Sequence, residues 1–371
     1  MMKSDFKDGA LTFYLEGRID SSNVARLEAE LRDEKSVFDN VNIAFDASKL
    51  QYISSAGLRV LLKIKKETKR PVRILNVSDE VFDIFDVTGF TEIFEVERKM
   101  RRITLNGCKR ISSALNGEIF QLSDDEMIKV YGKDVPLEDI RKERAYAQAA
   151  MVCGVPTLIP YDVVQCEEGY GIVFEKAETT SLSYVISHNL DQIPVYANML
   201  ARMIRELHRT EVPKDKFPDI KDRYHKWVEE IDDPSDSKTA VFSNLISSIP
   251  DSSTYVHGDI NLNSVMVQNG ELLLLDMAGS ARGNSLFDLQ ALFASLVAIE
   301  KNDEGYCLRT YGISSANCRK FWDEFFTVYM SDRQQEIESM NSLLMKYSVL
   351  KESVLMKLEN KNRLNKIIGE L

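Results

Sequence analysis

A short segment near residue 270 constrains the fold more than any other part of this chain of 371 residues. The dipeptide Asn269–Gly270 separates two apolar runs, a pattern typical of a two-residue β-hairpin turn. Asp259 precedes the first run, and Asp276 follows the second. A hairpin puts one carboxylate on each side of it, so both carboxylates can face a single cleft.

Two carboxylates that face one cleft suit phosphoryl transfer. One of them can accept or orient the proton of an acceptor hydroxyl. The other can hold Mg²⁺ on the phosphates of a nucleotide, because Mg²⁺ prefers hard oxygen ligands. Asp259 and Asp276 are therefore candidates for these two roles.

The first hundred residues show a different pattern. Apolar and polar side chains alternate at residues 11–15 and 41–45, and residues 71–75 form a third short apolar run. Possible N-cap residues at 21–23 and at Ser78 each precede a run with helical spacing. Strands that alternate with helices predict an α/β layer with helices packed on a sheet.

Residues 45–62, FDASKLQYISSAGLRVLL, resemble the signature of STAS domains of the anti-sigma-factor-antagonist type. Residues 86–90, DVTGF, are similar to the last helix of that family. The resemblance implies an α/β STAS domain, a mixed sheet with helices, over residues 1–104. It also implies a signalling role in which this domain binds an anti-sigma factor or switch kinase.

In the family, one serine at this helix start is phosphorylated by a partner kinase, and its position before Gly57 corresponds to Ser55. A helix N-terminus exposes unpaired N–H groups and the positive end of the helix dipole, so a phosphate is favourably placed there. The alternative is that Ser54 or Ser55 acts only as an N-cap. The two roles are compatible.

Residues 105–178 read as a β-rich small lobe, and residues 179–371 as a larger helical lobe, which predicts a bilobal α+β domain. Within the small lobe, Lys129 lies in a short apolar strand, and Glu143 lies near the middle of a charged helical segment. A lysine in an apolar strand needs a charge partner. Residues 334–370 are strongly helical in composition.

The sequence His257–Gly258–Asp259, followed by Asp276, is similar to the catalytic loop and metal aspartate of the aminoglycoside phosphotransferase and choline kinase family, which has a protein kinase-like fold. The resemblance implies ATP and Mg²⁺ as cofactors and a hydroxyl compound as acceptor. Asp259 would be the catalytic base, and Asp276 would bind the metal.

The same resemblance implies a nucleotide site. Lys129 would contact the phosphates and Glu143 would pair with it, although a purely structural ion pair is the alternative. Phe174, Glu175 and Ala177 would form the hinge that meets the adenine.

The chain departs from the family pattern after the catalytic aspartate. Ser264 stands where the family has a metal-binding asparagine, and Asn263 is adjacent, so both are candidate metal ligands. The phosphate-covering loop near Asn116 and Gly117 has a single glycine. These departures leave an alternative open, a non-catalytic domain that senses nucleotide while the STAS domain binds its partner and so regulates transcription.

The charge distribution excludes some partners. Residues 1–104 carry equal numbers of basic and acidic side chains, so the net charge of −11 belongs to the rest of the chain. This acidic balance argues against nucleic acid as a partner, because phosphate binding needs a basic face.

The five cysteines form no CxxC pair, so we expect reduced thiols. No run is long and apolar enough to span a membrane, so we expect a cytoplasmic protein.

Overall fold

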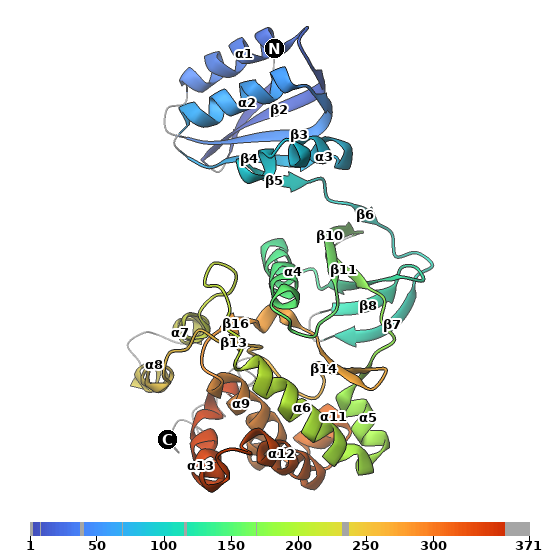
Figure 1. The fold of residues 1–371 in the computed structure, drawn as a ribbon, viewed down its shortest axis with the longest axis vertical. Helices are drawn as coiled ribbons and strands as arrows, with labels where there is room; N and C mark the ends of the chain where they lie inside the picture. Colours follow the sequence, from blue (N-terminus) through green and yellow to red (C-terminus); the bar gives the residue numbers. More distant parts are fainter. Residues whose placement is uncertain are drawn as a thin grey trace. The chain divides into compact units, whose positions relative to one another are not determined.

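The computed structural model describes residues 3–352, except for residue 8 and residues 38–40, 69, 115–116, 168 and 232–236. The chain divides into two compact units, Met1–Arg102 and Ile103–Leu371. Figure 1 shows the elements of both units coloured along the sequence.

The first unit contains a five-stranded mixed sheet in the order β1-β2-β3-β4-β5, in which β1 is antiparallel to β2 and the other neighbours are parallel. Alternate residues of β2, such as Phe13, are fully buried and form the core with Phe45 of β3. The elements are β1 (Lys3–Lys7), β2 (Ala10–Ile19), α1 (Val24–Val37), β3 (Asn42–Ile53), α2 (Ser55–Glu67), β4 (Val72–Val77), α3 (Asp79–Val87), the 3-10 turn η1 (Phe90–Glu92) and β5 (Glu95–Arg98). The predicted α/β layer is confirmed.

The small lobe of the second unit is a six-stranded sheet in the order β6-β10-β11-β9-β8-β7, and helix α4 packs against its strands β10 and β11. Strand β9 pairs with both β8 and β11, which places Lys129 opposite Ile119 and Ile172. The elements are β6 (Arg102–Ile103), β7 (Lys109–Ala114), β8 (Gly117–Gln121), β9 (Glu126–Tyr131), α4 (Leu137–Val152), β10 (Pro160–Cys166) and β11 (Gly169–Glu175). Asn116, in the predicted phosphate-covering loop, lies outside the described residues.

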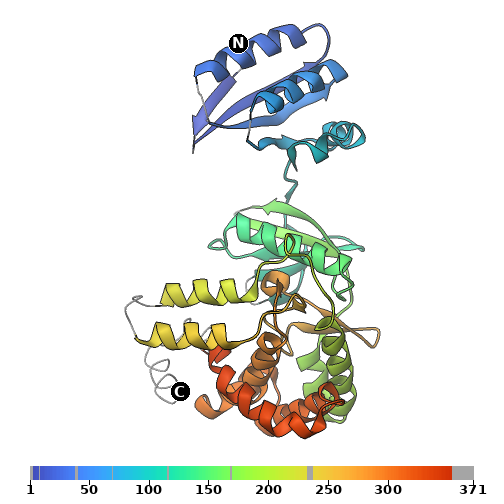
Figure 2. The same ribbon diagram turned by 60° about the vertical axis from the view of Figure 1, so that its left-hand side comes forward.

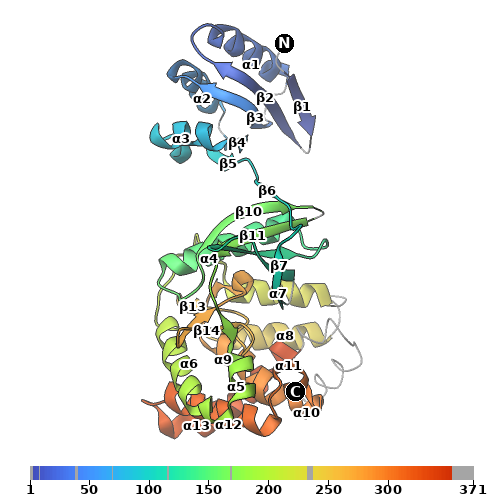
Figure 3. The same cartoon turned by 90° about the vertical axis from the view of Figure 1, so that its right-hand side faces the viewer.

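The large lobe is mainly helical, and Figure 3 shows α12 and α13 at the end of this lobe that lies away from the small lobe. Figure 2 shows α7 and α8, in yellow, side by side. The elements are β12 (Thr180–Ser181), α5 (Leu182–His188), η2 (Leu190–Gln192), α6 (Ile193–Leu207), α7 (Ile220–Ile231), α8 (Ser237–Ser248), β13 (Tyr255–Val256), β14 (Val265–Gln268), β15 (Glu271–Leu274), η3 (Met277–Gly279), β16 (Ala281–Arg282), α9 (Leu286–Phe293), the π-helix η4 (Ala294–Ala298), α10 (Ile299–Asn302), α11 (Tyr306–Tyr311), α12 (Ser315–Tyr329), η5 (Gln334–Glu336) and α13 (Ile337–Tyr347).

The predicted hairpin is present as β14 and β15, which pair antiparallel around Asn269 and Gly270. Both turn residues have positive φ angles, 50° and 82°, as a type I′ turn requires. The hairpin is therefore confirmed. The β-rich small lobe and the mainly helical large lobe confirm the bilobal plan. Of the predicted C-terminal helical region, α13 is observed, and residues 353–371 lie outside the described part. No helix among the described residues is long and apolar enough to cross a membrane.

Candidate functional site

A buried lysine joins two acidic residues between the lobes of the second unit. The Nζ atom of Lys129 lies 2.8 Å from Oε1 of Glu143 and 2.7 Å from Oδ1 of Asp276. The side chains of Lys129 and Glu143 are 8% and 6% exposed, whereas that of Asp276 is 37% exposed. Burial opposes the charge on Lys129, but the carboxylates of Asp276 and Glu143 outweigh it and raise the pKa of the lysine.

The local fold explains why these three side chains meet. Ile140, Glu143, Ala147 and Ala150 are the buried residues of α4, and their spacing defines one face of that helix. Helix α4 also packs against η3, the short turn that follows Asp276. The predicted pairing of Lys129 with Glu143 is thus present in the structure.

The loop that carries Asp259 is held by a buried carboxylate. Asp288, on α9, accepts hydrogen bonds of 2.7 Å from the backbone N–H groups of His257 and Gly258. Burial alone would raise the pKa of Asp288, but the hydrogen bond and charge of His208 lower it overall. Nε2 of His257 donates to the carbonyl oxygen of Leu275, at 2.8 Å. The hydrogen bonds of His257 and Asp288 therefore fix the conformation of this loop.

Gly258 is required at its position in this loop. Its φ angle is +79°, and an added Cβ atom would lie 2.2 Å from the carbonyl oxygen of Gly279. The loop of Asp259 and the turn after Asp276 are therefore packed directly against each other. This contact, together with the bond between His257 and Leu275, ties the two predicted aspartates into one site.

Two basic residues that the sequence did not single out also belong to this site. Nζ of Lys351 forms an ion pair with Oδ1 of Asp259, whose side chain is 34% exposed. The guanidinium of Arg223 donates to the carbonyl oxygens of Ala278 and Gly279. Burial lowers the pKa of Arg223. Neither residue lies in a motif, and each comes from a helical segment of ordinary composition, so no sequence signal points to them.

The two further candidate metal ligands are engaged with protein groups. Ser264 is 2% exposed, and its hydroxyl donates within its own loop to the carbonyl oxygen of Asn261, at 3.1 Å. Asn263 is exposed, its Oδ1 accepts from the hydroxyl of Ser183, and its Nδ2 donates to the carbonyl oxygen of Thr310, at 3.1 Å. Neither side chain is bonded to Asp276. Their metal-binding role stays a prediction.

The predicted hinge residues lie at the end of β11 and just after it. Phe174 is half-buried and packs beside Ile172. The side chain of Glu175 accepts a hydrogen bond of 2.9 Å from the N–H group of Ile159, which fixes the segment leading into β10. Ala177 is half-buried in the connection to the large lobe. Contact with an adenine stays a prediction for all three.

In the first unit, the two serines at the start of α2 have different environments. Ser54 is the N-cap, and its hydroxyl accepts a hydrogen bond from the N–H group of Gly57. Ser55 is the first residue of the helix and is exposed. Because Ser54 provides the cap, the hydroxyl of Ser55 is not needed for that purpose.

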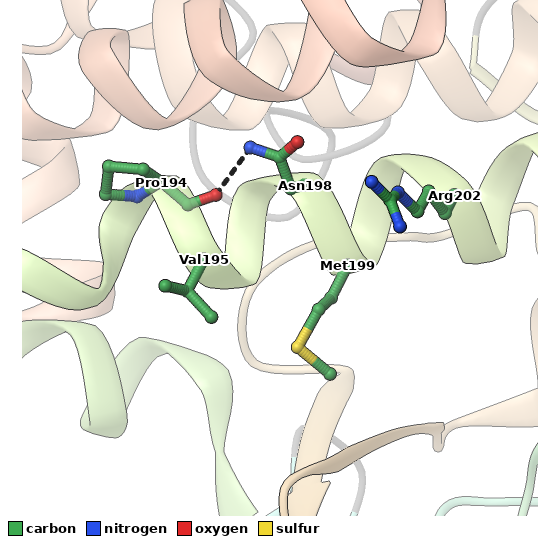
Figure 4. Close-up of a pocket in the computed structure, with 5 residues that line it drawn as sticks. All are labelled: Pro194, Val195, Asn198, Met199 and Arg202. Carbon is green, nitrogen blue, oxygen red and sulfur yellow. Dashed lines mark hydrogen bonds between the residues drawn. The ribbon is translucent and has the colours of Figure 1, made fainter.

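A separate surface hollow of about 400 Å³ lies along α6. Figure 4 shows that its lining residues, Pro194, Val195, Asn198, Met199 and Arg202, all come from this one helix. Asn198 donates to the carbonyl oxygen of Pro194, at 2.7 Å, which engages one of its amide N–H groups. The hollow contains none of the predicted site residues.

Comparisons with known proteins find a family for each of the two parts of the chain. The family model described as "Phosphotransferase enzyme family" matches residues 107–317. The chain belongs to the phosphotransferase enzyme family. The STAS domain model matches residues 2–103. BtrV of Bordetella bronchiseptica, a protein named as an anti-sigma factor antagonist, is 35% identical over 92 residues, which cover 24% of this phosphotransferase-family chain and 78% of BtrV.

Several solved structures are similar to this phosphotransferase-family chain. The ADP-bound aminoglycoside phosphotransferase APH(2'')-Ib is 16% identical, with 71% of this chain and 91% of that chain covered and a TM-score of 0.48. APH(2'')-IIa in complex with gentamicin is 17% identical, with 71% and 90% covered and a TM-score of 0.48. A choline/ethanolamine kinase family protein from Mesorhizobium loti is 15% identical, with 71% and 91% covered and a TM-score of 0.36.

The side chains present fit a magnesium nucleotide better than a metal cage made by protein alone. Among the residues that the structure describes, no three His, Cys, Asp or Glu side chains gather into a metal cluster. Asp276 offers a partly exposed carboxylate beside the cation of Lys129. Mg²⁺ is commonly bound by one or two carboxylates together with substrate phosphates and water, so this donor set is compatible with it.

Proposed function

We propose that the second domain transfers the terminal phosphoryl group of ATP, as its Mg²⁺ complex, to a hydroxyl acceptor. The observation that carries this proposal is the buried network of Lys129, Glu143 and Asp276 next to the loop of Asp259. A cation beside a partly exposed carboxylate suits a site for phosphates and metal, and an aspartate on the adjoining loop suits an acceptor hydroxyl.

The proposed roles follow from charge and exposure. Asp259 accepts the hydroxyl proton as the acceptor oxygen bonds to the phosphorus and the bond from phosphorus to the leaving ADP oxygen breaks. Asp276 would hold Mg²⁺, which would neutralise charge on the phosphates. Lys129 would exchange its contact with Asp276 for the nucleotide phosphates while Glu143 keeps it oriented. The hinge of Phe174, Glu175 and Ala177 would receive the adenine.

We further propose that the STAS domain binds an anti-sigma factor or switch kinase, and that phosphorylation of Ser55 regulates this binding. The exposure of Ser55 at the start of α2 supports the proposal. A phosphate there adds a charge of about −1.5 to −2 at the positive end of the helix dipole, which changes a docking surface without unfolding the domain.

A second candidate function is a nucleotide sensor without transfer activity. It is favoured by the hydrogen bonds that engage Asn263 and Ser264 with protein groups, because these bonds leave Asp276 without a second protein ligand for metal. In this case Mg-ATP binds and stabilises the domain, but no phosphoryl group is transferred.

Radiolabelled transfer separates the two candidates. The protein is incubated with ATP labelled at the γ-phosphate and Mg²⁺, with a panel of small hydroxyl compounds and proteins, and both inorganic phosphate and labelled products are measured. We expect Asp259→Asn to abolish turnover. The substitution also leaves the buried ammonium of Lys351 without its carboxylate, so the folded state of the variant is checked by circular dichroism at the assay temperature. Asp191→Asn, an exposed aspartate in η2, is the matched control and should retain wild-type rates. Full activity in Asp259→Asn would show that the base is wrongly assigned.

A further inference from the structure

The strongest unexplained feature of the site is the ion pair between Lys351 and Asp259. Lys351 lies 92 residues from Asp259 in the sequence, yet its Nζ atom contacts Oδ1 of that carboxylate. Its side chain is 9% exposed, whereas that of Asp259 is 34% exposed. The ammonium is therefore largely removed from water, and the carboxylate remains accessible on another side.

The chain on either side of Lys351 is built into the large lobe. Leu350 is fully buried in the main hydrophobic core. Glu352 is 3% exposed and accepts hydrogen bonds from Nδ2 of Asn302, at 3.1 Å, and from the hydroxyl of Ser348, at 3.2 Å. Moving the backbone of Lys351 would cost these groups their core contacts and hydrogen bonds, so the lysine is anchored in the large lobe beside Asp259.

The ion pair leaves half of the carboxylate free for chemistry. A buried ammonium is stable only when it is paired, so Lys351 holds Asp259 in one orientation. The hydrogen bonds among the described residues engage Oδ1 of Asp259 and do not reach Oδ2. A base must lie within about 2.6–3.2 Å of the hydroxyl it serves, so the direction of this second oxygen matters for transfer.

We propose that Lys351 is a positioning residue of the phosphotransfer site. It fixes Asp259 through Oδ1 and directs Oδ2 toward the acceptor hydroxyl. The inference rests on the proposed function, because it assigns Lys351 a role in that same transfer. It also makes the C-terminal part of the large lobe a component of the catalytic centre, although the phosphotransferase family model ends at residue 317.

Steady-state kinetics of the wild-type protein and of three variants test the proposal. Lys351→Met keeps the apolar stem and removes the charge, and Lys351→Arg keeps the charge. Lys346→Met alters an exposed lysine on α13 and is the matched control. The rate of ADP formation from Mg-ATP, which counts transfer to an acceptor and to water alike, is measured over a range of ATP concentrations, with the wild-type protein as reference.

We expect Lys351→Met to lower kcat about 10- to 100-fold, because a misdirected base costs this much in comparable cases. The KM for Mg-ATP should stay unchanged, because Asp259 serves the acceptor and not the nucleotide. Lys351→Arg should recover most of kcat, and Lys346→Met should match the wild type. A purely structural role for Lys351 would not separate kcat from KM in this way. If Lys351→Met does not fold, Lys351→Gln replaces it with the same expectation.

Two results would overturn the inference alone. Unchanged kcat in Lys351→Met would show that the pair does not position the base, and a raised kcat would show that Lys351 covers the site. If the wild-type protein releases no phosphate and labels no acceptor, the proposed transfer function itself fails, and this inference falls with it. Wild-type turnover therefore distinguishes the two failures.

Discussion

Removing the charge of Lys129 should destabilise the second domain more than removing that of Glu143. In Lys129→Met, the carboxylate of Glu143 stays buried without its cation. Breaking a buried ion pair from one side costs about 3–5 kcal/mol. In Glu143→Gln, Lys129 keeps its 2.7 Å contact with Asp276, so the expected cost is about 1 kcal/mol.

Urea unfolding followed by tryptophan fluorescence measures this difference in the intact chain. Both tryptophans, Trp227 and Trp322, belong to the second domain and pack in or against its core, so the signal reports on that domain alone. With an m-value of about 3 kcal/mol per molar urea, Lys129→Met should lower the midpoint by about 1–1.7 M. Lys142→Met, an exposed lysine on α4, is the control and should leave the midpoint unchanged.

If Lys129→Met unfolded at the wild-type midpoint, the buried carboxylate of Glu143 would not depend on Lys129 for its stability. If Glu143→Gln lost as much stability as Lys129→Met, Asp276 would not be compensating the lysine. Either result would contradict the expected difference in stability. The double variant Lys129→Met/Glu143→Gln should recover part of the loss, since it removes both buried charges together.

Three further predictions concern Gly258 in the loop before Asp259, the buried Asp288 that holds this loop, and Ser55 at the start of α2. Gly258→Ala should cost at least about 1–3 kcal/mol of stability and abolish turnover, because its Cβ would meet the carbonyl of Gly279; thermal unfolding and phosphate release measure both effects. The pKa of Asp288 is lower in the folded state than in the unfolded state. Its ionised carboxylate therefore stabilises the fold above about pH 4, and this stabilisation is lost as the pH falls through the lowered pKa. Asp288→Asn should flatten this acid dependence of the unfolding free energy, measured from pH 2 to 7. Ser55→Asp should abolish capture of the anti-sigma factor or switch kinase in a pull-down, whereas Ser55→Ala and Asp259→Asn should retain capture. Equal capture by all three variants would argue against regulation at Ser55.

Local signals in the sequence were sufficient for the hairpin and for the expectation that Lys129 has a charged partner. The pair Asn269–Gly270 adopts the positive φ angles that its residue types favour, which is a property of the turn itself. Lys129 is an unusual residue for an apolar strand, so a buried partner could be expected from its desolvation cost alone. Its pairing with Glu143 followed from the family resemblance.

The remaining contacts depend on packing between segments far apart in the chain. The contact of Lys129 with Asp276 spans 147 residues, and that of Lys351 with Asp259 spans 92. Lysine is common on helices, so the composition of the last helical region could not distinguish Lys351 from exposed lysines such as Lys346. The structure shows that Lys351, which follows the buried Leu350, is the lysine that reaches Asp259.

We propose that Lys129 and Asp276 form a working site for a magnesium nucleotide. A thermal-shift titration with ATP, with and without Mg²⁺, on the wild-type protein and on Asp276→Ala tests it most directly. A ligand that binds only the folded state stabilises it by about 2.7 kcal/mol at 100 times its Kd. We predict a Mg²⁺-dependent rise in Tm that Asp276→Ala loses. No rise at millimolar Mg-ATP, or an equal rise in Asp276→Ala, would contradict the claim.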